Sequence, residues 1–355
     1  MNRHPLSRPF RLKSRARRSA YLLLATTTLA LGVLIACAGC TPPKDATRTP
    51  NETPSVAETV TPSVLRRVTY SDACPFNQKV PTNAKVDPDS AAMVNSLLRD
   101  AQKQGFYVAV DAWTIPVYYA DEETPRYDVA LTASWASTRT MREVPIPAQA
   151  APDPEEDGHM VIIDSAAHRE YDLFQAKKSG GGWRASWGNS IGTEGPGVFA
   201  NGASARGSGF ALLAGLIWPD ELKDQRIDHA LVFSFNHTKS GGPVAPATES
   251  DGTSSKSDAI PEGARIQLDP GLDLDTLGLE PYEKTIAKAL QEYGMILGDD
   301  GGGISLYAIH PMSVRGNPYA GVLPSPDPDY GVVFLPNIPV EKFRVIELGP
   351  QIPNK

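Results

Sequence analysis

Two segments of the chain carry apolar residues at helical spacing. The residues from Met93 to Ala101 follow a capping run and precede a glycine, which predicts a helix over residues 90–104. The second segment begins at Pro281, keeps its apolar residues on one face and ends at Gly294. Both segments therefore predict helices that pack against the rest of the fold.

The rest of the pattern consists of short β-branched and aromatic runs separated by turns rich in acidic residues, Pro or Gly. Because no helical runs separate neighbours in the first half, we expect antiparallel pairing rather than βαβ units. This predicts a mainly β fold with a few helices, an antiparallel β-sandwich or jelly-roll-like single domain over residues 68–350. Two domains divided at 148–157 are the alternative, but 106–147 is short for a core of its own. The expected strands are 106–110, 116–119, 127–133, 159–164, 170–176, 183–187, 231–235, 264–268, 295–297, 304–308, 332–335 and 343–348.

The N-terminus has the features of an export signal. Basic residues precede an uncharged, mostly apolar run over 20–36, whose length suits a signal peptide and is short for a spanning helix. The run ends Leu-Ile-Ala-Cys, which resembles the lipobox of bacterial lipoproteins. We therefore predict a signal peptide over 1–36, lipidation of Cys37 and a Pro/Thr-rich tether within 37–67. An uncleaved anchor is the alternative, and Arg17-Arg18 leaves the twin-arginine export route open.

The choice of lipidation site decides what the other cysteines can do. Cys40, after a small residue pair, is the alternative site. Cleavage before Cys37 leaves Cys40 and Cys74 free to pair in an oxidising compartment, whereas cleavage before Cys40 leaves Cys74 alone. Three cysteines in all exclude a disulfide-dense scaffold and a zinc site with four cysteine ligands.

Composition and charge exclude further classes. The chain has 355 residues, and its 41% hydrophobic content is far too high for a wholly disordered protein. Residues 1–36 hold seven of the 34 basic residues and no acid, so the mature chain has 27 basic against 41 acidic residues, a net charge of −14. A folded part this acidic is unsuited to gripping a nucleic-acid backbone, so no nucleic acid is expected as a partner.

The sequence gives little support for the common catalytic motifs. The sequence contains no HExxH, no GxxxxGK[ST], no GxGxxG after a strand and no regular EF-hand loop. One GxSxG match covers 188–192, but the following Thr-Glu-Gly-Pro-Gly cannot begin the helix that a nucleophile elbow needs. The glycine runs at 180–182 and 301–303 open no helix and indicate turns.

Polar residues at strand ends are the remaining candidates for chemistry. His229 follows Asp228 at the start of an apolar strand, where a carboxylate could orient it as a general base; a histidine satisfied by a backbone carbonyl is the structural alternative. Glu249 and Asp251 lie two apart in an exposed loop. Asp300 closes a strand before three glycines, which permit close approach of a ligand.

Two further features fit a carbohydrate ligand. His159 stands at the mouth of another strand, directly after Asp157-Gly158. Large aromatic rings are numerous for an extracellular β protein and suit stacking on sugars, although most rings in a sandwich fill its core. These rings are Trp113, Tyr118, Tyr119, Trp135, Trp183, Trp187 and Trp218.

Calcium is the one metal that the sequence raises. Asp269, Asp273 and Asp275 lie near Glu280 and offer oxygen ligands. Their spacing fits no standard calcium loop, and the helix that follows favours acids at its start. We therefore expect no metal site and no cofactor, with calcium as the alternative.

The sequence contains a series of distinctive blocks at 157–159, 171–176, 214–217, 227–231, 246–247, 251–252, 261–265 and 289–294. These blocks resemble a widespread family of secreted proteins of actinobacteria and other bacteria for which no activity is settled. The resemblance covers roughly residues 105–310, with the blocks in the same order. It implies secretion and a shared fold, and it gathers His229, Asp251, Gln175 and Asp300 into one set of candidates.

Together these observations predict a lipid-anchored protein on the extracytoplasmic face of the cell membrane that binds or cleaves cell-envelope or environmental polysaccharide. A non-catalytic wall-associated binding or structural lipoprotein is the alternative. For cleavage, we expect acid–base chemistry by His229 with Asp251 or Asp300. The expected substrate-binding residues are His159, Gln175, Trp183 and Glu249. The oligomeric state is left open.

Overall fold

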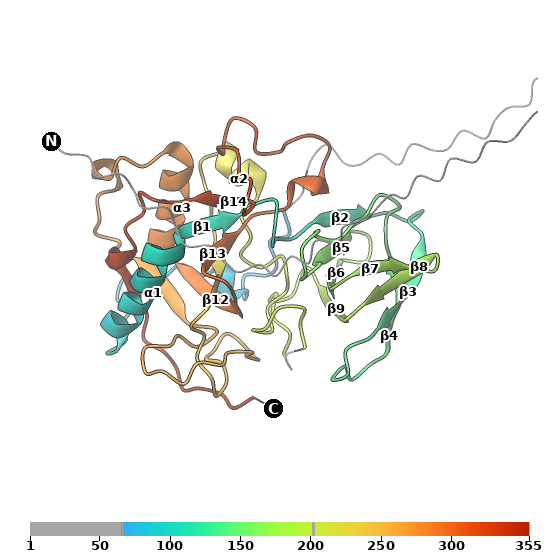
Figure 1. Ribbon diagram of the computed structural model, residues 1–355, viewed down its shortest axis with the longest axis horizontal. Coiled ribbons are helices and arrows are strands. Elements are labelled where there is room, and N and C mark those ends of the chain that lie inside the picture. The colour runs from blue at the N-terminus through green and yellow to red at the C-terminus, as the bar shows by residue number, and fades with distance from the viewer. Residues whose placement is uncertain (1–64, 66, 201–202, 355) are drawn as a thin grey trace, which may run out of the picture. The chain divides into compact units, whose positions relative to one another are not determined.

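The computed structural model describes residues 65, 67–200 and 203–354. The predicted signal peptide, both candidate lipidation sites and nearly all of the predicted tether lie outside these residues. The described chain is mainly β and has three helices, α1 (Ser90–Gln104), α2 (Pro219–Lys223) and α3 (Pro281–Glu292), as Figure 1 shows. The strands are β1 (Phe106–Ala109), β2 (Val117–Ala120), β3 (Arg126–Leu131), β4 (Thr140–Pro145), β5 (Met160–Asp164), β6 (Arg169–Phe174), β7 (Lys177–Ser179), β8 (Gly182–Ala185), β9 (Trp187–Gly192), β10 (Leu231–Phe235), β11 (Arg265–Leu268), β12 (Met295–Asp300), β13 (Ile304–Tyr307), β14 (Val332–Phe334) and β15 (Phe343–Val345).

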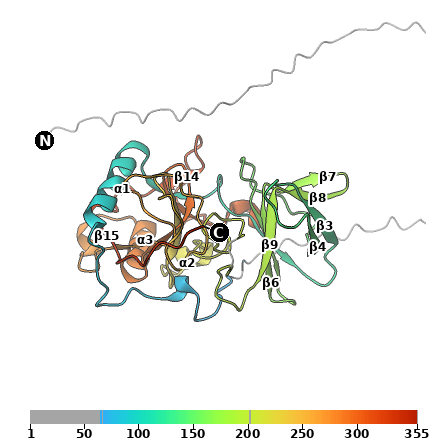
Figure 2. The ribbon, with the colours of Figure 1, turned by 90° about the horizontal axis from the view of Figure 1, so that it is seen from below.

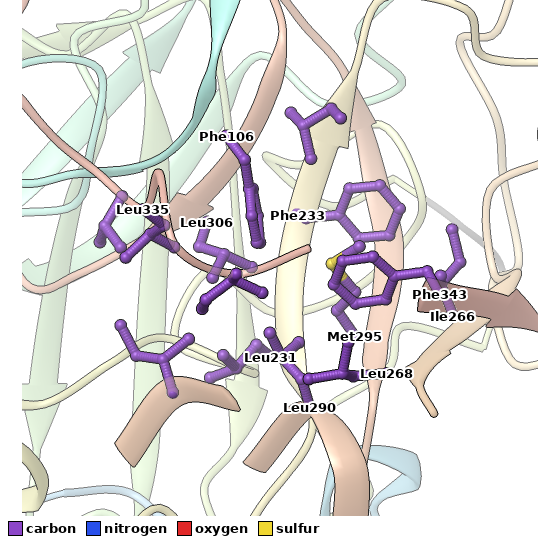
Figure 3. Packing of buried hydrophobic residues seen from close by; sticks show 14 of the residues in the cluster. Phe106, Leu231, Phe233, Ile266, Leu268, Leu290, Met295, Leu306, Leu335 and Phe343 are labelled. Atoms are coloured by element: carbon purple, nitrogen blue, oxygen red, sulfur yellow. The ribbon is translucent and has the colours of Figure 1, made fainter. Parts of the chain in front are cut away.

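A seven-stranded sheet with the order β14-β1-β13-β10-β12-β11-β15 forms one part of the fold. Alternate residues of a strand face opposite sides. In β10, Leu231 and Phe233 therefore join the core that α1 and α3 cover, whereas Val232 joins the core on the other face. Figure 3 shows Leu290 of α3 beside Leu231 within the first of these cores.

Two four-stranded sheets form the other part, with the orders β2-β5-β6-β9 and β4-β3-β8-β7. Figure 2 shows β6 and β9 of the first beside β3, β4 and β8 of the second. Met160 and Ile162 of β5 lie in the core between these two sheets, while Val161 and Ile163 pack into the core shared with β10. Strand β5 is therefore buried on both faces.

The prediction of a mainly β fold with helices is confirmed, but the expectation of purely antiparallel pairing is wrong. Strands β1 and β13, β10 and β12, β2 and β5, and β3 and β8 pair in parallel, so all three sheets are mixed. The partners in these pairs lie far apart in the sequence, and the spacing of neighbouring runs carries no information about them. The three sheets do not form a single antiparallel sandwich.

Most expected elements are observed within a few residues of their predicted bounds. The expected strand 183–187 is instead two strands, β8 and β9, and β4, β7 and α2 were not expected. Strand β4 escapes the pattern because its first residues are charged or half-exposed. No helix in the described part of the chain is long and apolar enough to cross a membrane.

Candidate functional site

Three carboxyl groups converge where the parallel strands β10 and β12 end. Asp299 is the penultimate residue of β12, Asp251 lies in the long loop after β10, and Glu262 lies just before β11. One carboxylate oxygen of each residue lies within 4.8 Å of the others. We call these three residues the acidic site.

A break in strand register places Asp299 in the site. Phe233 pairs with Leu297, but Ser234 pairs with Asp299, so Gly298 is an extra residue on β12. A bulge of this kind redirects the side chains that follow it. A Cβ at position 298 would lie 2.6 Å from the Val232 side chain, so only glycine fits there.

Glu262 forms the buried floor of the acidic site. Its side chain is fully buried, and its Oε2 accepts a hydrogen bond from the Asp251 backbone N–H at 3.1 Å. Its Oε1 has no hydrogen-bond partner among the described residues. Asp251 is exposed and Asp299 is partly exposed, so the site opens to solvent on their side.

The chain segment over 203–208 lies against the acidic site, and we call it the 203–208 segment. The Asp251 carboxylate presses so closely on Gly207 that a Cβ there would lie 2.6 Å from its carbon. The Gly207 backbone N–H also donates a hydrogen bond to Asp299. A side chain at position 207 would therefore displace the Asp251 carboxylate.

Arg206, next in the same segment, is a buried cation beside the site. Its guanidinium lies 3.5 Å from Asp299, donates to the Leu212 carbonyl at 3.2 Å and stands over the Tyr307 ring. Its Nε finds no partner within the described chain. One positive charge therefore opposes the three carboxyl groups.

The carboxyl groups of the site hold protons more tightly than usual. Burial raises the pKa of Glu262 to about 9, with a further contribution from the charges of Asp251 and Asp299. Burial also raises the pKa of Asp299 to about 7, although Arg206 opposes this rise. The pKa of Asp251 is raised by burial and by the charge of Asp300. Perturbed carboxyl groups of this kind are concentrated at functional sites.

Of the residues singled out from the sequence, Asp251 and Asp300 lie together. The Asp300 backbone N–H donates to the Asp251 carboxylate, and the Asp300 side chain interacts with Thr238. Glu249 holds the 203–208 segment from the same loop, because its Oε2 accepts from the Ala203 backbone N–H at 2.6 Å.

His159 contacts the 203–208 segment, and Gln175 lies beside the turn that precedes His159. The His159 ring nitrogen Nε2 is 3.3 Å from the Ala205 carbonyl, and burial together with the Arg206 charge lowers the pKa of this histidine to about 3. The Gln175 backbone N–H donates to the Asp157 carbonyl at 2.8 Å, which places it beside the 157–159 turn. His159 is therefore a neutral hydrogen-bonding group at neutral pH.

His229 is not part of this assembly. It precedes β10, whereas Asp300 pairs with Phe235 at the other end of that strand. The buried ring bonds Glu221 at 3.0 Å and the Ala230 carbonyl at 2.8 Å. The adjacent Asp228 pairs with Arg226, so it does not orient the histidine as expected. One reaction centre cannot include both His229 and Asp300.

The tryptophans divide into core and surface residues. Trp183 is buried, with the Lys178 ammonium 5.4 Å from its ring centre, so it offers no open face. Trp135 is 64% exposed and its ring centre lies 5.2 Å from that of the buried Trp187. The Trp187 indole N–H donates to the Ala203 carbonyl at 2.8 Å, which connects this pair to the 203–208 segment.

The calcium ligands and the disulfide that the sequence left as alternatives can now be compared with the structure. Asp269 and Asp273 accept backbone hydrogen bonds within their own turns, and Asp275 pairs with Lys284. Cys74 is a free, buried thiol in the described chain, and its conditional partner Cys40 lies outside the described residues, so their pairing stays a prediction.

Sequence reasoning missed Glu262, Asp299 as a member of the site, and Arg206. Glu262 lies between Pro261 and Gly263 in one of the resembling blocks, but nothing in that block indicates that the acid is buried. The sequence indicates Asp300 as a candidate but not its neighbour Asp299. The bulge before Asp299 and the loop that holds Asp251 place both acids near Asp251.

A second pair of acids supports the chain that follows Arg206. Asp172 and Glu170 of β6 accept hydrogen bonds from the backbone N–H groups of Leu212 and Leu213 at 3.0 and 3.1 Å, and Tyr70 donates to Glu170. Burial and the Asp172 charge raise the pKa of Glu170 well above its usual value, and burial raises that of Asp172 to about 6. Both are buried, so their role is to position the backbone.

Comparison with known proteins yields no relative. No family model matches the chain, no curated protein matches it, and no solved structure matches it. Functional inference therefore depends on the residues of this chain, and the family resemblance stays a prediction.

Proposed function

We propose that this chain is a lipid-anchored extracytoplasmic protein that binds polysaccharide of the cell envelope or the environment. The export signal and lipobox-like motif ending at Cys37, with Cys40 as the alternative, support the address. The main observation in favour of binding is the exposed ring of Trp135, which packs against the ring of the buried Trp187.

The surroundings of Trp135 suit a sugar ligand. A tryptophan ring offers a large rigid apolar face, and polar groups at its edge fix the orientation of a sugar. The hydrogen bond from Trp187 to Ala203 links the ring pair to the segment that also contacts Glu249 and Asp251, both exposed. These two carboxylates are acceptors for sugar hydroxyl groups.

Binding comes before cleavage in this proposal for two reasons. His229, the expected base, lies at the far end of β10 from the acids. Glu262, whose raised pKa would suit a general acid, is fully buried and cannot reach a glycosidic oxygen. Cleavage is the second candidate because one observation favours it: Asp251 and Asp299 face the open side of the acidic site, and both have raised pKa values, that of Asp299 being about 7.

The test is affinity electrophoresis of the full chain through arabinan, galactan, peptidoglycan and β-glucan fragments, with reducing ends measured in parallel. We expect at least one glycan to retard the protein, and Trp135→Ala to weaken that binding by about tenfold, or about 1.4 kcal/mol. Trp113→Ala is the matched control, because Trp113 is also exposed, at 44%, whereas the ring that packs against Trp187 is that of Trp135.

Each outcome decides between the candidates. Retardation that Trp135→Ala abolishes and Trp113→Ala preserves supports the binding role. New reducing ends that disappear in Asp251→Asn establish cleavage instead. If no glycan retards the protein, or if both tryptophan variants weaken binding equally, the surface around Trp135 is not the binding site.

A further inference from the structure

The acidic site presents a set of hard oxygen donors from three separate parts of the chain. Asp251 comes from the loop after β10, Glu262 from the turn before β11 and Asp299 from the end of β12. Nothing in the polysaccharide proposal requires these three groups to meet. Carboxylate oxygens that converge from different elements are the donors that calcium prefers.

The unpartnered oxygen of Glu262 is a second observation that indicates a ligand. Buried polar atoms in folded proteins almost always have a partner, and leaving one without a partner is costly. The Glu262 side chain is fully buried against Asp251 and Asp299, yet its Oε1 accepts no hydrogen bond from any described residue. When Glu262 is protonated, its hydrogen bond to the Asp251 side chain satisfies the carboxyl group. When Glu262 is ionised, a cation between the three carboxylates supplies the missing partner.

We propose that the acidic site binds one calcium ion through carboxylate oxygens of Asp251, Glu262 and Asp299. Calcium–oxygen bonds of about 2.3–2.6 Å place ligands on opposite sides of the ion about 4.6–5.2 Å apart. The three oxygens already lie within 4.8 Å of one another. Magnesium, with bonds of about 2.0–2.1 Å and strict octahedral geometry, requires a tighter set.

The charge of the surroundings matches a divalent cation. The ionised acidic site carries three negative charges, one each on Asp251, Glu262 and Asp299. The guanidinium of Arg206, 3.5 Å from Asp299, neutralises one of them. The remaining two negative charges equal the charge of one calcium ion. Asp300 beside Asp251 and Asp157 near Asp299 add negative potential at longer range.

The site is also accessible to a hydrated ion. Asp251 is exposed and the Asp299 side chain is 20% exposed, while Glu262 closes the site from below. Calcium takes six to eight oxygen ligands, so water or a sugar hydroxyl completes the shell on the open side. The ion site stands on the protein residues alone and does not depend on the polysaccharide proposal.

The test is isothermal titration of CaCl₂ into the full chain, purified in detergent and freed of metal with EDTA, with no glycan present. Thermal melts of the same samples with and without calcium provide a second readout. At calcium well above the dissociation constant, we expect the melting temperature to rise by about 5 °C. Glu262→Gln keeps the shape of the side chain and should weaken calcium binding at least tenfold.

Two further variants make the result specific. Asp251→Asn changes an exposed ligand, so it should fold normally and also lose calcium binding. Asp273→Asn is the matched control, because Asp273 belongs to the other acidic stretch of the sequence and accepts a hydrogen bond only within its own turn. This control should bind calcium as the unaltered chain does.

The proposal is overturned if the unaltered chain neither binds millimolar calcium nor gains melting temperature. It is equally overturned if Glu262→Gln and Asp251→Asn bind as tightly as the unaltered chain, or if Asp273→Asn alone abolishes binding. Because no glycan is present, a failure here is separate from a failure of polysaccharide binding.

Discussion

Replacing Glu262 with glutamine removes a carboxyl group of the acidic site whose pKa is strongly raised, and it preserves the shape of the side chain. The folded pKa of Glu262 is about 9, because burial disfavours the charged form, whereas an unfolded glutamate titrates near its usual value of about 4.3. Between these values the folded state holds a proton that the unfolded state has released. The contribution of Glu262 to stability is therefore full below about pH 4 and is lost as pH rises toward about 9.

The size of the effect follows from this difference. When only the folded state holds a proton, the free energy of unfolding falls by about 1.4 kcal/mol for each unit by which the pH rises. From about pH 5 to about pH 8 the unaltered chain should lose on the order of 4 kcal/mol through Glu262 alone. Glu262→Gln has no such proton, so its stability should fall less over that range. The amide can still donate to Asp251 or Asp299.

The assay is urea unfolding of both proteins in EDTA at several pH values between about 5 and 8. The stability difference should change by about 4 kcal/mol across the range, in favour of the variant at the higher pH. Addition of calcium should reverse the order, because only the unaltered chain gains a ligand. Parallel pH profiles for the two proteins would refute the assignment of a protonated, buried Glu262.

Two further predictions concern the buried groups around the 203–208 segment. Glu170→Ala leaves the Leu213 N–H without its acceptor and should cost about 3 kcal/mol in urea unfolding, whereas Glu170→Gln should cost less than about 1 kcal/mol; equal costs would contradict the pairing. Arg206→Met leaves Asp299 unpaired and should cost about 3–5 kcal/mol at pH 8. That cost should shrink at pH 5, below the Asp299 pKa of about 7, and a cost independent of pH would contradict the ion pair.

The local sequence pattern was sufficient to predict an element where buried and exposed positions alternate regularly along it. The predicted strand 231–235 is β10, and the predicted helix 90–104 is α1. In both, the period of the apolar residues matches the face that the core covers. The pairing of β10 with β12 could not be predicted in this way, because 59 residues separate the end of β10 from the start of β12. Strand direction across such a gap depends on packing, which no local window contains.

In the candidate site, too, some residues could be predicted from the sequence and others could not. Asp251 and Asp300 were predicted from loop and turn composition, and they do lie together. Glu262 could not be predicted, because a single acid between Pro and Gly has the composition of an exposed turn. Its burial results from the fit of that turn under the Asp251 loop and against β12. His229 failed for the opposite reason: its sequence neighbours suggested exposure at a strand mouth, but Glu221 of α2 encloses it.

The 203–208 segment explains why residues from distant blocks of the sequence meet. Ala203 bonds both the Trp187 indole and the Glu249 carboxylate, Arg206 reaches Asp299, and Gly207 abuts Asp251. Six residues without regular secondary structure thus support the aromatic surface at one end and the acidic site at the other. Their contacts are made largely through backbone atoms, and backbone contacts impose little on residue type except where a carboxylate excludes a Cβ. A segment of this kind therefore organises the site while leaving almost no trace in the sequence beyond Gly207.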